Sequence, residues 1–310
     1  MNLPILPQNI KFFDIAANLC DDEFEGIYHE KKYHESDLSE VIFRAEKMNV
    51  SHMLLSAGSL NDIIKSYEIS KSNKNFFISA GIHPCRASEE LKLNNNNVDE
   101  IFKNLENLII KYKNKIITIG ECGLDYDRFN YSNKEDQKLL FSPHFNLAQK
   151  YNFSMYFHNR NTNNDFFNVV KENRNKFNKG IVHSFTGNEN DLNNFLSLNL
   201  FVGLTGTSFK NKENVEIVKK IPLDKIIIET DAPYCEIKKS NEGFKYVETF
   251  FEGRLKKEKM KKGFMCKERN EPCTMIQVLE VVSKVKNVDK NEVAKMCFQN
   301  CFELFGLKNE

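Results

Sequence analysis

Long apolar runs are absent from this 310-residue sequence, since nowhere do 18 apolar residues follow one another. The N-terminus also lacks the basic region and apolar stretch of a secretory signal. We therefore expect a cytoplasmic protein with no membrane segment, with unconventional secretion left open. Neither sign of charge dominates, because the net charge is +1 and the pI about 7.5. No overall basic field indicates nucleic acid, so any DNA contact must come from a local groove.

The sequence also lacks closely spaced cysteine pairs. The eight cysteines are scattered and form neither the CxxC pairs of a zinc ribbon nor a dense disulfide framework. Reduced thiols are the expectation. Hydrophobic residues make up 41% and charged residues 28% of the chain, a balance typical of a globular protein with a sizeable core.

Short apolar runs recur along the chain, and each precedes a stretch whose apolar residues fall at helical spacing. Eight such βα units predict an α/β protein with a single (β/α)8 TIM-barrel domain over residues 1–310. A doubly wound open sheet is the alternative, but no GxGxxG follows the first strand. The predicted strands are Ile10–Ile15, Ser51–Ser56, Phe76–Ile82, Ile116–Glu121, Phe153–His158, Gly180–Ser184, Leu200–Leu204 and Lys225–Asp231.

The segments outside the repeating units are also predictable. A polar insertion over about 236–268 carries a basic run, Lys256 to Lys262, which is either a solvated helix face or a patch that contacts a nucleic-acid backbone. Two C-terminal helices follow, over about Thr274–Lys284 and Asn291–Phe305. Ser132 with Glu135 three residues later has the spacing of a capping box at the start of a helix.

Histidines and carboxylates gather at the predicted strand ends, where TIM barrels carry their chemistry. A closed barrel brings strand ends together around one axis, so residues far apart in sequence can converge on a metal. The remaining four histidines, which lie elsewhere, are interpreted as structural. The converging set is His83, Glu121, His158, His183 and Asp231.

A divalent ion at this set would neutralise charge on a phosphoryl group and lower the pKa of a bound water. We assign Glu121 as a shared ligand and His158 and His183 as nitrogen ligands. Asp231 is either a further ligand or the base that orients and deprotonates the water. Glu229, two residues earlier on the same strand face, is interpreted either as a buried structural acid or as a residue that orients a metal ligand.

Seven short strings extend this pattern over nearly the whole chain. In this order they resemble the successive signatures of the TatD family of deoxyribonucleases, metallo-dependent hydrolases of the amidohydrolase type. The strings are FDIAANL at 13–19, GIHP at 81–84, GECGLDYDR at 120–128, FHNR at 157–160, VHSF at 182–185, ETDAP at 229–233 and RNEP at 269–272.

The resemblance implies a TIM barrel with a divalent metal, Mg²⁺ with Mn²⁺ or Zn²⁺ as alternatives, that cleaves DNA phosphodiesters from the 3′ end, with endonuclease action left open. Four residues match the family's metal positions: Glu121, His158, His183 and Asp231. His83 matches an active-site histidine that contacts the substrate phosphate in the family. The expected partner is DNA that is single-stranded or has frayed ends, and no protein partner can be inferred.

The first strand departs from the family's fuller pattern. Many members carry an HxH pair there that ligates a second metal, whereas this chain has Ala16 and Asn18, as does another branch of the family. We therefore expect one tight metal site and a weak second one, for which the amide oxygen of Asn18 is a candidate ligand. Asn18 is also a candidate substrate contact.

Further substrate contacts are predicted beside the strand ends. Arg128 and Arg160 are candidates for bidentate phosphate contacts, because guanidinium matches phosphate geometry. Four rings follow strand ends, where bases of a single strand can stack. They are Tyr126, Phe185, Phe209 and Tyr234.

Two other functions remain open. The same site could hydrolyse an ester or amide, such as an aminoacyl-tRNA, since metal-activated water attacks carbonyls as well as phosphates. A non-catalytic binding protein on the same barrel is the second alternative, although such a protein gains nothing from keeping Glu121, His158, His183 and Asp231.

Overall fold

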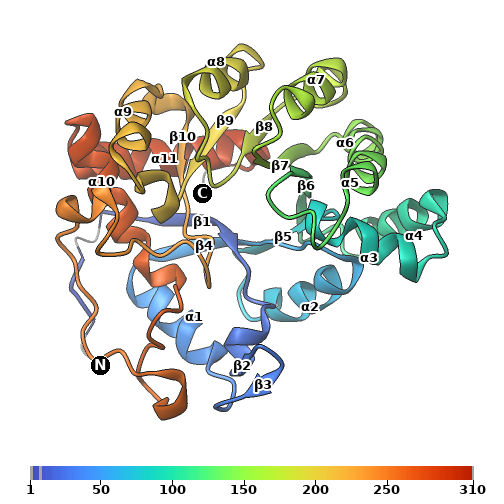
Figure 1. Ribbon diagram of the computed structural model, residues 1–310. Coiled ribbons are helices and arrows are strands. Elements are labelled where there is room, and N and C mark those ends of the chain that lie inside the picture. The colour runs from blue at the N-terminus through green and yellow to red at the C-terminus, as the bar shows by residue number, and fades with distance from the viewer. Residues whose placement is uncertain (1–2, 7–8, 309–310) are drawn as a thin grey trace. The chain divides into compact units, whose positions relative to one another are not determined.

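A computed structural model describes residues 3–6 and 9–308, in which strands and helices alternate along the chain (Figure 1). The main sheet has eight parallel strands, and their sheet order follows the chain order, as in a (β/α)8 barrel. All eight predicted strands are confirmed. They are β1 (Phe12–Ala17), β4 (Val50–Leu55), β5 (Phe76–Ala80), β6 (Ile116–Asp125), β7 (Ser154–Arg160), β8 (Gly180–Val182), β9 (Phe201–Leu204) and β10 (Ile226–Ile228).

Helices follow the strands, as the helical spacing predicts. The two predicted C-terminal helices are confirmed as α10 and α11, with ends shifted by one or two residues. The helices are α1 (Leu38–Lys47), α2 (Leu60–Ser70), α3 (Ala87–Leu93), α4 (Val98–Lys111), α5 (Lys134–Phe141), α6 (His144–Tyr151), α7 (Asp165–Glu172), α8 (Glu189–Ser197), α9 (Lys212–Lys220), α10 (Met275–Lys286) and α11 (Lys290–Phe305).

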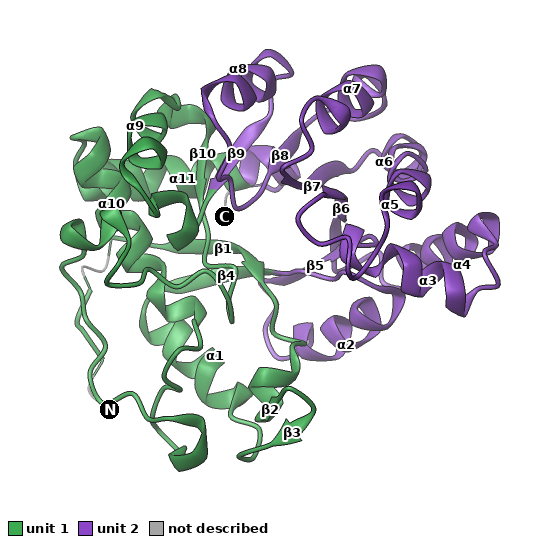
Figure 2. Ribbon diagram, in the orientation of Figure 1, with its two compact units in different colours: residues 1–54, 204–301 green, residues 55–203, 302–310 purple. Residues whose placement is uncertain are grey.

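The chain divides into two compact units, which Figure 2 colours separately. Unit 1 combines residues 1–54 with residues 204–301 and contains β1, β10, α1, α9 and α10. Unit 2 spans residues 55–203 and 302–310 and contains β5 to β8 with helices α2 to α8.

Strand β6 is the central element of unit 2, and it is longer than the sequence predicts. It runs on past Glu121 to Asp125 and pairs in parallel with β5 and with β7. Gly123 permits the close approach to β7, because a Cβ there would lie 1.9 Å from the backbone oxygen of His158. Its φ of 149° also favours glycine. The backbone of β6 is thereby held against His158.

The start of α5 corrects one prediction. Asn133, and not Ser132, caps the helix, since its side chain accepts a hydrogen bond from the Asp136 backbone N–H. Ser132 is buried, and its hydroxyl accepts a hydrogen bond from the Ser88 backbone N–H at 3.0 Å. Two adjacent residues with capping side chains, Ser132 and Asn133, stand here, and tertiary contact decides which one caps.

The polar insertion contains little regular structure. Its two 3₁₀ turns are η6 (Glu242–Tyr246) and η7 (Lys257–Lys259), so the basic run does not form the helix face that was one interpretation. Lys257 lies over the rings of Tyr28 and Tyr33, 4.8 and 4.6 Å from their centroids. Tyr28 belongs to a short unpredicted hairpin, β2 (Ile27–Tyr28) with β3 (Lys31–Lys32).

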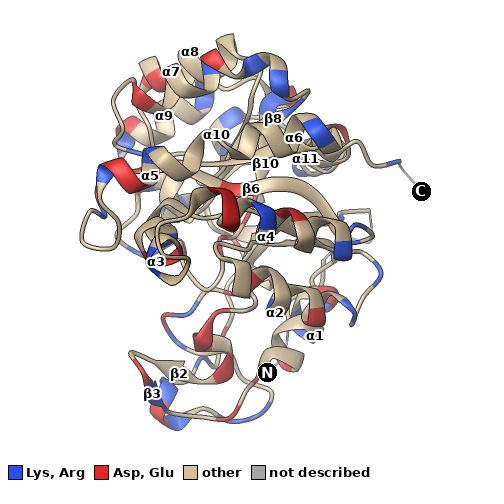
Figure 3. Ribbon diagram, turned by 90° about the vertical axis from the view of Figure 1, so that its right-hand side faces the viewer, with Lys and Arg blue, Asp and Glu red and all other residues tan. Residues whose placement is uncertain are grey.

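Both signs of charge are interspersed over the helices, as Figure 3 shows for α4 and α5. All eight cysteines are free thiols, as expected. Among the described residues, every helix is too short or too polar to cross a membrane.

Candidate metal centre

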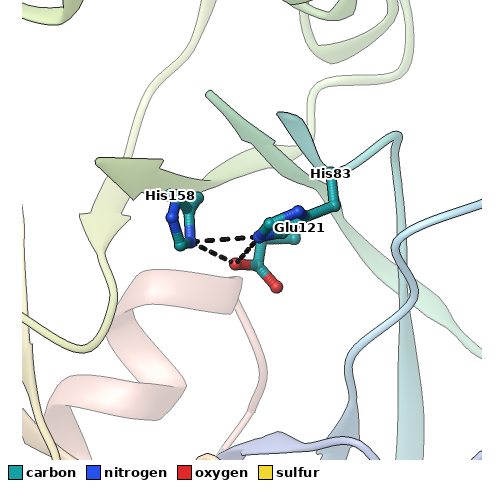
Figure 4. A group of neighbouring side chains, drawn as sticks. All are labelled: His83, Glu121 and His158. Carbon is teal, nitrogen blue, oxygen red and sulfur yellow. Dashed lines mark hydrogen bonds and ion pairs between the residues drawn. The ribbon is translucent and has the colours of Figure 1, made fainter. Parts of the chain in front are cut away.

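The candidate metal centre of unit 2 lies at the carboxyl ends of four consecutive strands. His83 follows β5, Glu121 lies in β6, His158 lies in β7, and His183 follows β8. Parallel strands end at the same edge of a sheet, so neighbouring strands bring these side chains together. Figure 4 shows His83, Glu121 and His158 facing one another.

One carboxylate oxygen, Oε1 of Glu121, is the hub of this cluster. His183 Nε2 lies 2.6 Å from it, His158 Nδ1 2.9 Å, and His83 Nε2 3.4 Å. The imidazole nitrogens also crowd one another, with His158 Nδ1 3.2 Å from His83 Nε2 and 3.4 Å from His183 Nε2. We call these four residues the Glu121 cluster. Four sequence-predicted residues are therefore brought together around one point.

The cluster perturbs the pKa values of its members. Burial opposes ionisation of Glu121, but the charges of His183 and His83 outweigh it and hold the pKa of this carboxyl well below its usual range. Burial lowers the pKa of His158, whereas hydrogen bonds to Asp125 and Glu121 raise it, and the net direction is upward. The carboxylate therefore stays charged although the site is largely buried.

The two ring nitrogens of His83 have different partners. The Cys85 backbone N–H donates to Nδ1 at 3.0 Å, which leaves that nitrogen without a proton. The proton of the ring is then on Nε2, the atom that faces Glu121. His83 accordingly presents an N–H donor to the cluster and no lone pair.

His158 lies between two carboxylates, one at each ring nitrogen. Its Nε2 lies 3.0 Å from Oδ2 of Asp125, a fully buried carboxylate that accepts the ring proton there. Nδ1 lies 2.9 Å from Oε1 of Glu121, and because a carboxylate only accepts, Nδ1 donates the hydrogen bond there. Binding of an ion would displace this proton. A carboxylate behind a histidine in this way fixes the tautomer that a metal requires.

Asp125 is the residue that sequence reasoning missed. It lies four residues after Glu121 on β6, and because side chains alternate along a strand, both are on the same face. Burial raises the pKa of Asp125, but the hydrogen bond to His158 and the charges of His158 and Arg128 together outweigh it, and the net direction is downward. The alternation of side chains along a strand would have placed Asp125 on the face of Glu121 if β6 had been predicted to continue past Glu121.

A second buried histidine supports the loop that carries His83. His144, at the start of α6, accepts a hydrogen bond from the Ile82 backbone N–H at its Nε2, and its Nδ1 donates to the Leu140 carbonyl. Burial lowers the pKa of His144 to about 4, so the ring is neutral. The interpretation of this histidine as structural agrees with these contacts.

The donor set of the cluster suits a divalent ion. In the described part of the chain, ligand atoms of His83, Glu121 and His158 lie within 4.8 Å of one another. Because His83 carries its proton on Nε2, the available donors are Glu121, His158 and His183. Imidazole with carboxylate suits Zn²⁺ and Mn²⁺ and is compatible with a catalytic site that keeps an open position.

Asp231 belongs to unit 1, where its carboxylate lies at a left-handed residue with a φ of 54°. Its Oδ1 accepts a hydrogen bond from the Asn18 amide at 2.9 Å, and its Oδ2 accepts from the Cys235 thiol at 3.1 Å. Non-glycine residues in this conformation are held by their surroundings and are frequent at functional sites. Whether Asp231 completes the Glu121 cluster stays a prediction.

The chain around Asp231 is clamped from both sides. The Asn270 side chain donates to the Thr230 carbonyl at 3.1 Å, and its backbone N–H donates to the Pro233 carbonyl at 2.8 Å. Thr230 in turn donates to Asp14, from both its backbone and its hydroxyl. The RNEP string thus positions the ETDAP string within unit 1.

Two further acids of unit 1 are buried. Asp14 and Glu229 are both fully inaccessible to solvent. Burial raises the pKa of Asp14 to about 7, against the hydrogen bonds from Thr230, which lower it. The interpretation of Glu229 as a buried acid is confirmed.

The predicted phosphate contacts lie beside the cluster or close to it. Arg128 Nε is 3.7 Å from Oδ2 of Asp125, and its side chain is about half exposed. Arg160, the last residue of β7, pairs with Asp127 at 2.8 Å. Tyr126 donates its hydroxyl hydrogen bond to Asp165 at 2.7 Å.

Two of the four rings predicted to stack on bases are buried and cannot contact a nucleic acid. Phe185 and Phe209 are buried, with exposed fractions of 5% and 0%. A position after a strand end does not tell whether a side chain turns inward, and both rings pack into the protein. Tyr234 is 50% exposed, and its hydroxyl donates to Asp21.

Comparison with known proteins gives an independent view of this site. The model of the family described as TatD related DNase matches residues 13–306. A protein named deoxyribonuclease Tat-D, from Schizosaccharomyces pombe, is 35% identical over 303 residues, which cover 96% of this chain and 97% of the relative. One named 3′-5′ ssDNA/RNA exonuclease TatD, from Pectobacterium carotovorum, is 25% identical, with coverage of 95% and 99%.

A solved structure agrees with these matches. The crystal structure of a hydrolase TatD family protein from Entamoeba histolytica superimposes with a TM-score of 0.88 and 35% sequence identity. The match covers 96% of this chain and 98% of that one. Fold and sequence therefore point to the same family.

Proposed function

Because this chain belongs to the TatD-related DNase family, we propose that it is a metal-dependent deoxyribonuclease that hydrolyses DNA phosphodiester bonds, proceeding from the 3′ end. The observation that carries the proposal is the Glu121 cluster, in which three imidazoles converge on one charged, buried carboxylate. The 3′ to 5′ direction and the single-stranded substrate rest on the name of the Pectobacterium relative.

In this proposal Glu121, His158 and His183 hold a divalent ion, with Asp231 as a further ligand or as the base. The ion supplies charge neutralisation at the phosphoryl oxygens and lowers the pKa of the attacking water. Asp125 accepts the proton on His158 Nε2, so Nδ1 is the ring nitrogen that would bind the ion. The donor set is tolerant of Mg²⁺ and Mn²⁺ and, through its nitrogens, favours Mn²⁺ or Zn²⁺ in affinity.

The other site residues act on the substrate. His83 donates the N–H of its Nε2 to a phosphate oxygen, since its Nδ1 is occupied by the Cys85 backbone. Arg128 and Arg160 present guanidinium groups to neighbouring phosphates. Asp231, where it acts as the base and not as a ligand, would orient the water and accept its proton. Its amide partner Asn18 holds the carboxylate in place.

A second ion binds weakly in this proposal. The two first-strand positions that carry histidine in many family members are Ala16 and Asn18 here, and the Asn18 amide donates its hydrogen to Asp231. Only the Asn18 oxygen and a shared carboxylate are left as ligands. We expect a second ion to be recruited when a substrate phosphate contributes its own oxygens.

Digestion of labelled DNA tests this function directly. Single- and double-stranded oligonucleotides labelled at the 3′ or the 5′ end are incubated with the metal-free chain while Mg²⁺ or Mn²⁺ is titrated. The proposal predicts metal-dependent, progressive loss of the 3′ label, with the single strand degraded faster. An aryl ester serves as the comparison substrate. Ester hydrolysis without DNA cleavage would overturn the proposal and favour an ester hydrolase on the same site.

A further inference from the structure

The loop between β6 and α5 (Figure 1) follows the strand that carries Glu121, and its middle is exposed. All residues from 127 to 131 are exposed, between the buried Asp125 and Ser132. The loop carries two large rings in this exposed stretch: Phe129 is 48% and Tyr131 64% exposed. Water-facing rings of this size stand out beside a candidate active site.

Hydrogen bonds fix both ends of this loop. The buried Gln137 side chain donates to the carbonyls of Asp125 and Ser132, each at 2.9 Å. Its oxygen accepts from the Asp125 backbone N–H at 2.7 Å. The exposure of Phe129 and Tyr131 is thus a property of an anchored loop, which presents both rings at a defined place.

The rings are accompanied by a cation and by a third ring. Tyr126 lies 5.2 Å from Phe129 between centroids, with an angle of 33° between the planes. Arg128 precedes the two exposed rings in the chain, and its Nε lies 3.7 Å from the Asp125 oxygen that faces His158. One carboxylate therefore links the base of the loop to the candidate metal centre.

We propose that Phe129 and Tyr131 form a platform on which bases of a single-stranded nucleic acid stack while the scissile phosphate is at the Glu121 cluster. This inference rests on the proposed function and extends it to the part of the substrate beyond the cleaved bond. Residues 126–131 carry one acid and one base, Asp127 and Arg128, so charge alone does not attract a phosphate backbone. Stacking on aromatic faces is the interaction the loop offers, and it requires unpaired bases.

The platform is tested by binding, apart from any cleavage. A fluorescent oligothymidylate is titrated with the full chain in the presence of a chelator, and anisotropy is recorded. Stacking on an aromatic side chain predicts that the paired substitution Phe129→Ala and Tyr131→Ala weakens binding by roughly 5- to 100-fold for each ring that holds a base. An abasic strand of equal length should bind the wild type and the variant equally.

Matched variants separate stacking from other effects. Phe129→Leu with Tyr131→Leu keeps apolar side chains at the surface but removes the rings, and should lose affinity as the alanine pair does. Tyr131→Phe keeps the ring and should retain wild-type affinity. Phe43→Ala, at a 53% exposed ring on α1, is the control and should bind normally.

Cleavage of a small phosphodiester, bis(p-nitrophenyl) phosphate, distinguishes failure of the platform from failure of the proposed function. The leucine pair should cleave this substrate at the wild-type rate. If the wild type cleaves no phosphodiester at all, the nuclease proposal fails, and the binding experiment still decides whether the rings hold bases. Equal oligothymidylate affinity for the wild type and the leucine pair would overturn the platform, and would leave the rings as a surface for a protein partner.

Discussion

Two buried carboxyl groups, one in each unit, have opposite electrostatic surroundings. Glu121 in unit 2 faces three imidazoles, and its pKa is held well below the usual range. Asp14 in unit 1 receives hydrogen bonds from Thr230 and Ala16, which are neutral donors, and burial raises its pKa to about 7. Burial alone thus does not make an acid a metal ligand. The surrounding imidazoles, which keep the Glu121 carboxylate charged, distinguish the candidate centre from a structural acid.

The largest expected effect comes from removing the charge of Glu121. Glu121→Gln keeps the volume but removes the charge on which the three histidines converge, so metal is lost. Several kcal/mol of charge stabilisation are lost with it, and cleavage should fall by about 10³-fold or more. Steady-state cleavage of a labelled single strand measures this effect. Near-normal turnover by a well-folded variant would contradict the assignment, and Glu100→Gln on α4, an exposed position, is the control.

Substitution of His83 distinguishes a substrate contact from a metal ligand within unit 2, because this imidazole donates a proton and offers no lone pair. His83→Ala should lower kcat by about 10²-fold with the bound metal unchanged, as expected for loss of a transition-state contact. Arg160→Ala should act in the same way but more weakly, since the Arg160 side chain is exposed. Kinetics together with elemental analysis check both variants. A fall of metal content in step with activity would place His83 among the ligands.

Asp125 is predicted to act through His158. Asp125→Asn keeps the shape of the side chain but weakens its hold on the His158 proton, and metal affinity should fall by about 10- to 100-fold. Calorimetric metal titration measures this change. Asp127→Asn, two residues away on an exposed turn, is the matched control. Equal metal affinity for Asp125→Asn and the wild type would show that the buried hydrogen bond has no role in binding.

The raised pKa of Asp14 in unit 1 predicts that the stability of the fold depends on pH. Between pH about 4 and about 7 the unfolded chain ionises Asp14 while the folded chain keeps the proton, so the folded state loses stability as pH rises. This loss amounts to at most about 4 kcal/mol over that range. Asp14→Asn should remove this component of the pH dependence of urea unfolding, whereas Asp99→Asn, at an exposed residue, should not. The same pH dependence of unfolding for Asp14→Asn and the wild type would contradict the raised pKa of Asp14.

The eight strands and the cluster could be read from the sequence because both rest on local patterns. Strands covered on both faces are continuous apolar runs, and polar residues at their ends mark the catalytic edge. The end of β6 could not be read, since Cys122 and Leu124 continue its buried pattern beyond the first functional residue. Asp125 was missed for that reason.

Side-chain direction was the other unpredictable feature. Phe185 follows the predicted ligand His183 by two residues, yet it packs against Phe195 at 5.9 Å between centroids. Phe129 and Tyr131, which lie in a loop without a regular period, point into solvent. Tertiary packing decides such directions, and a single sequence records them only through residue type.

The central claim is that Glu121, with His158 and His183, holds one divalent ion. Calorimetric titration of the metal-free, full-length chain with Mn²⁺, in the absence of DNA, tests it most directly, with Glu121→Gln as the partner sample. The account predicts one tightly bound ion per wild-type chain and no tight binding by Glu121→Gln. Two tightly held ions in the wild type, or one ion held equally well by Glu121→Gln, would contradict it.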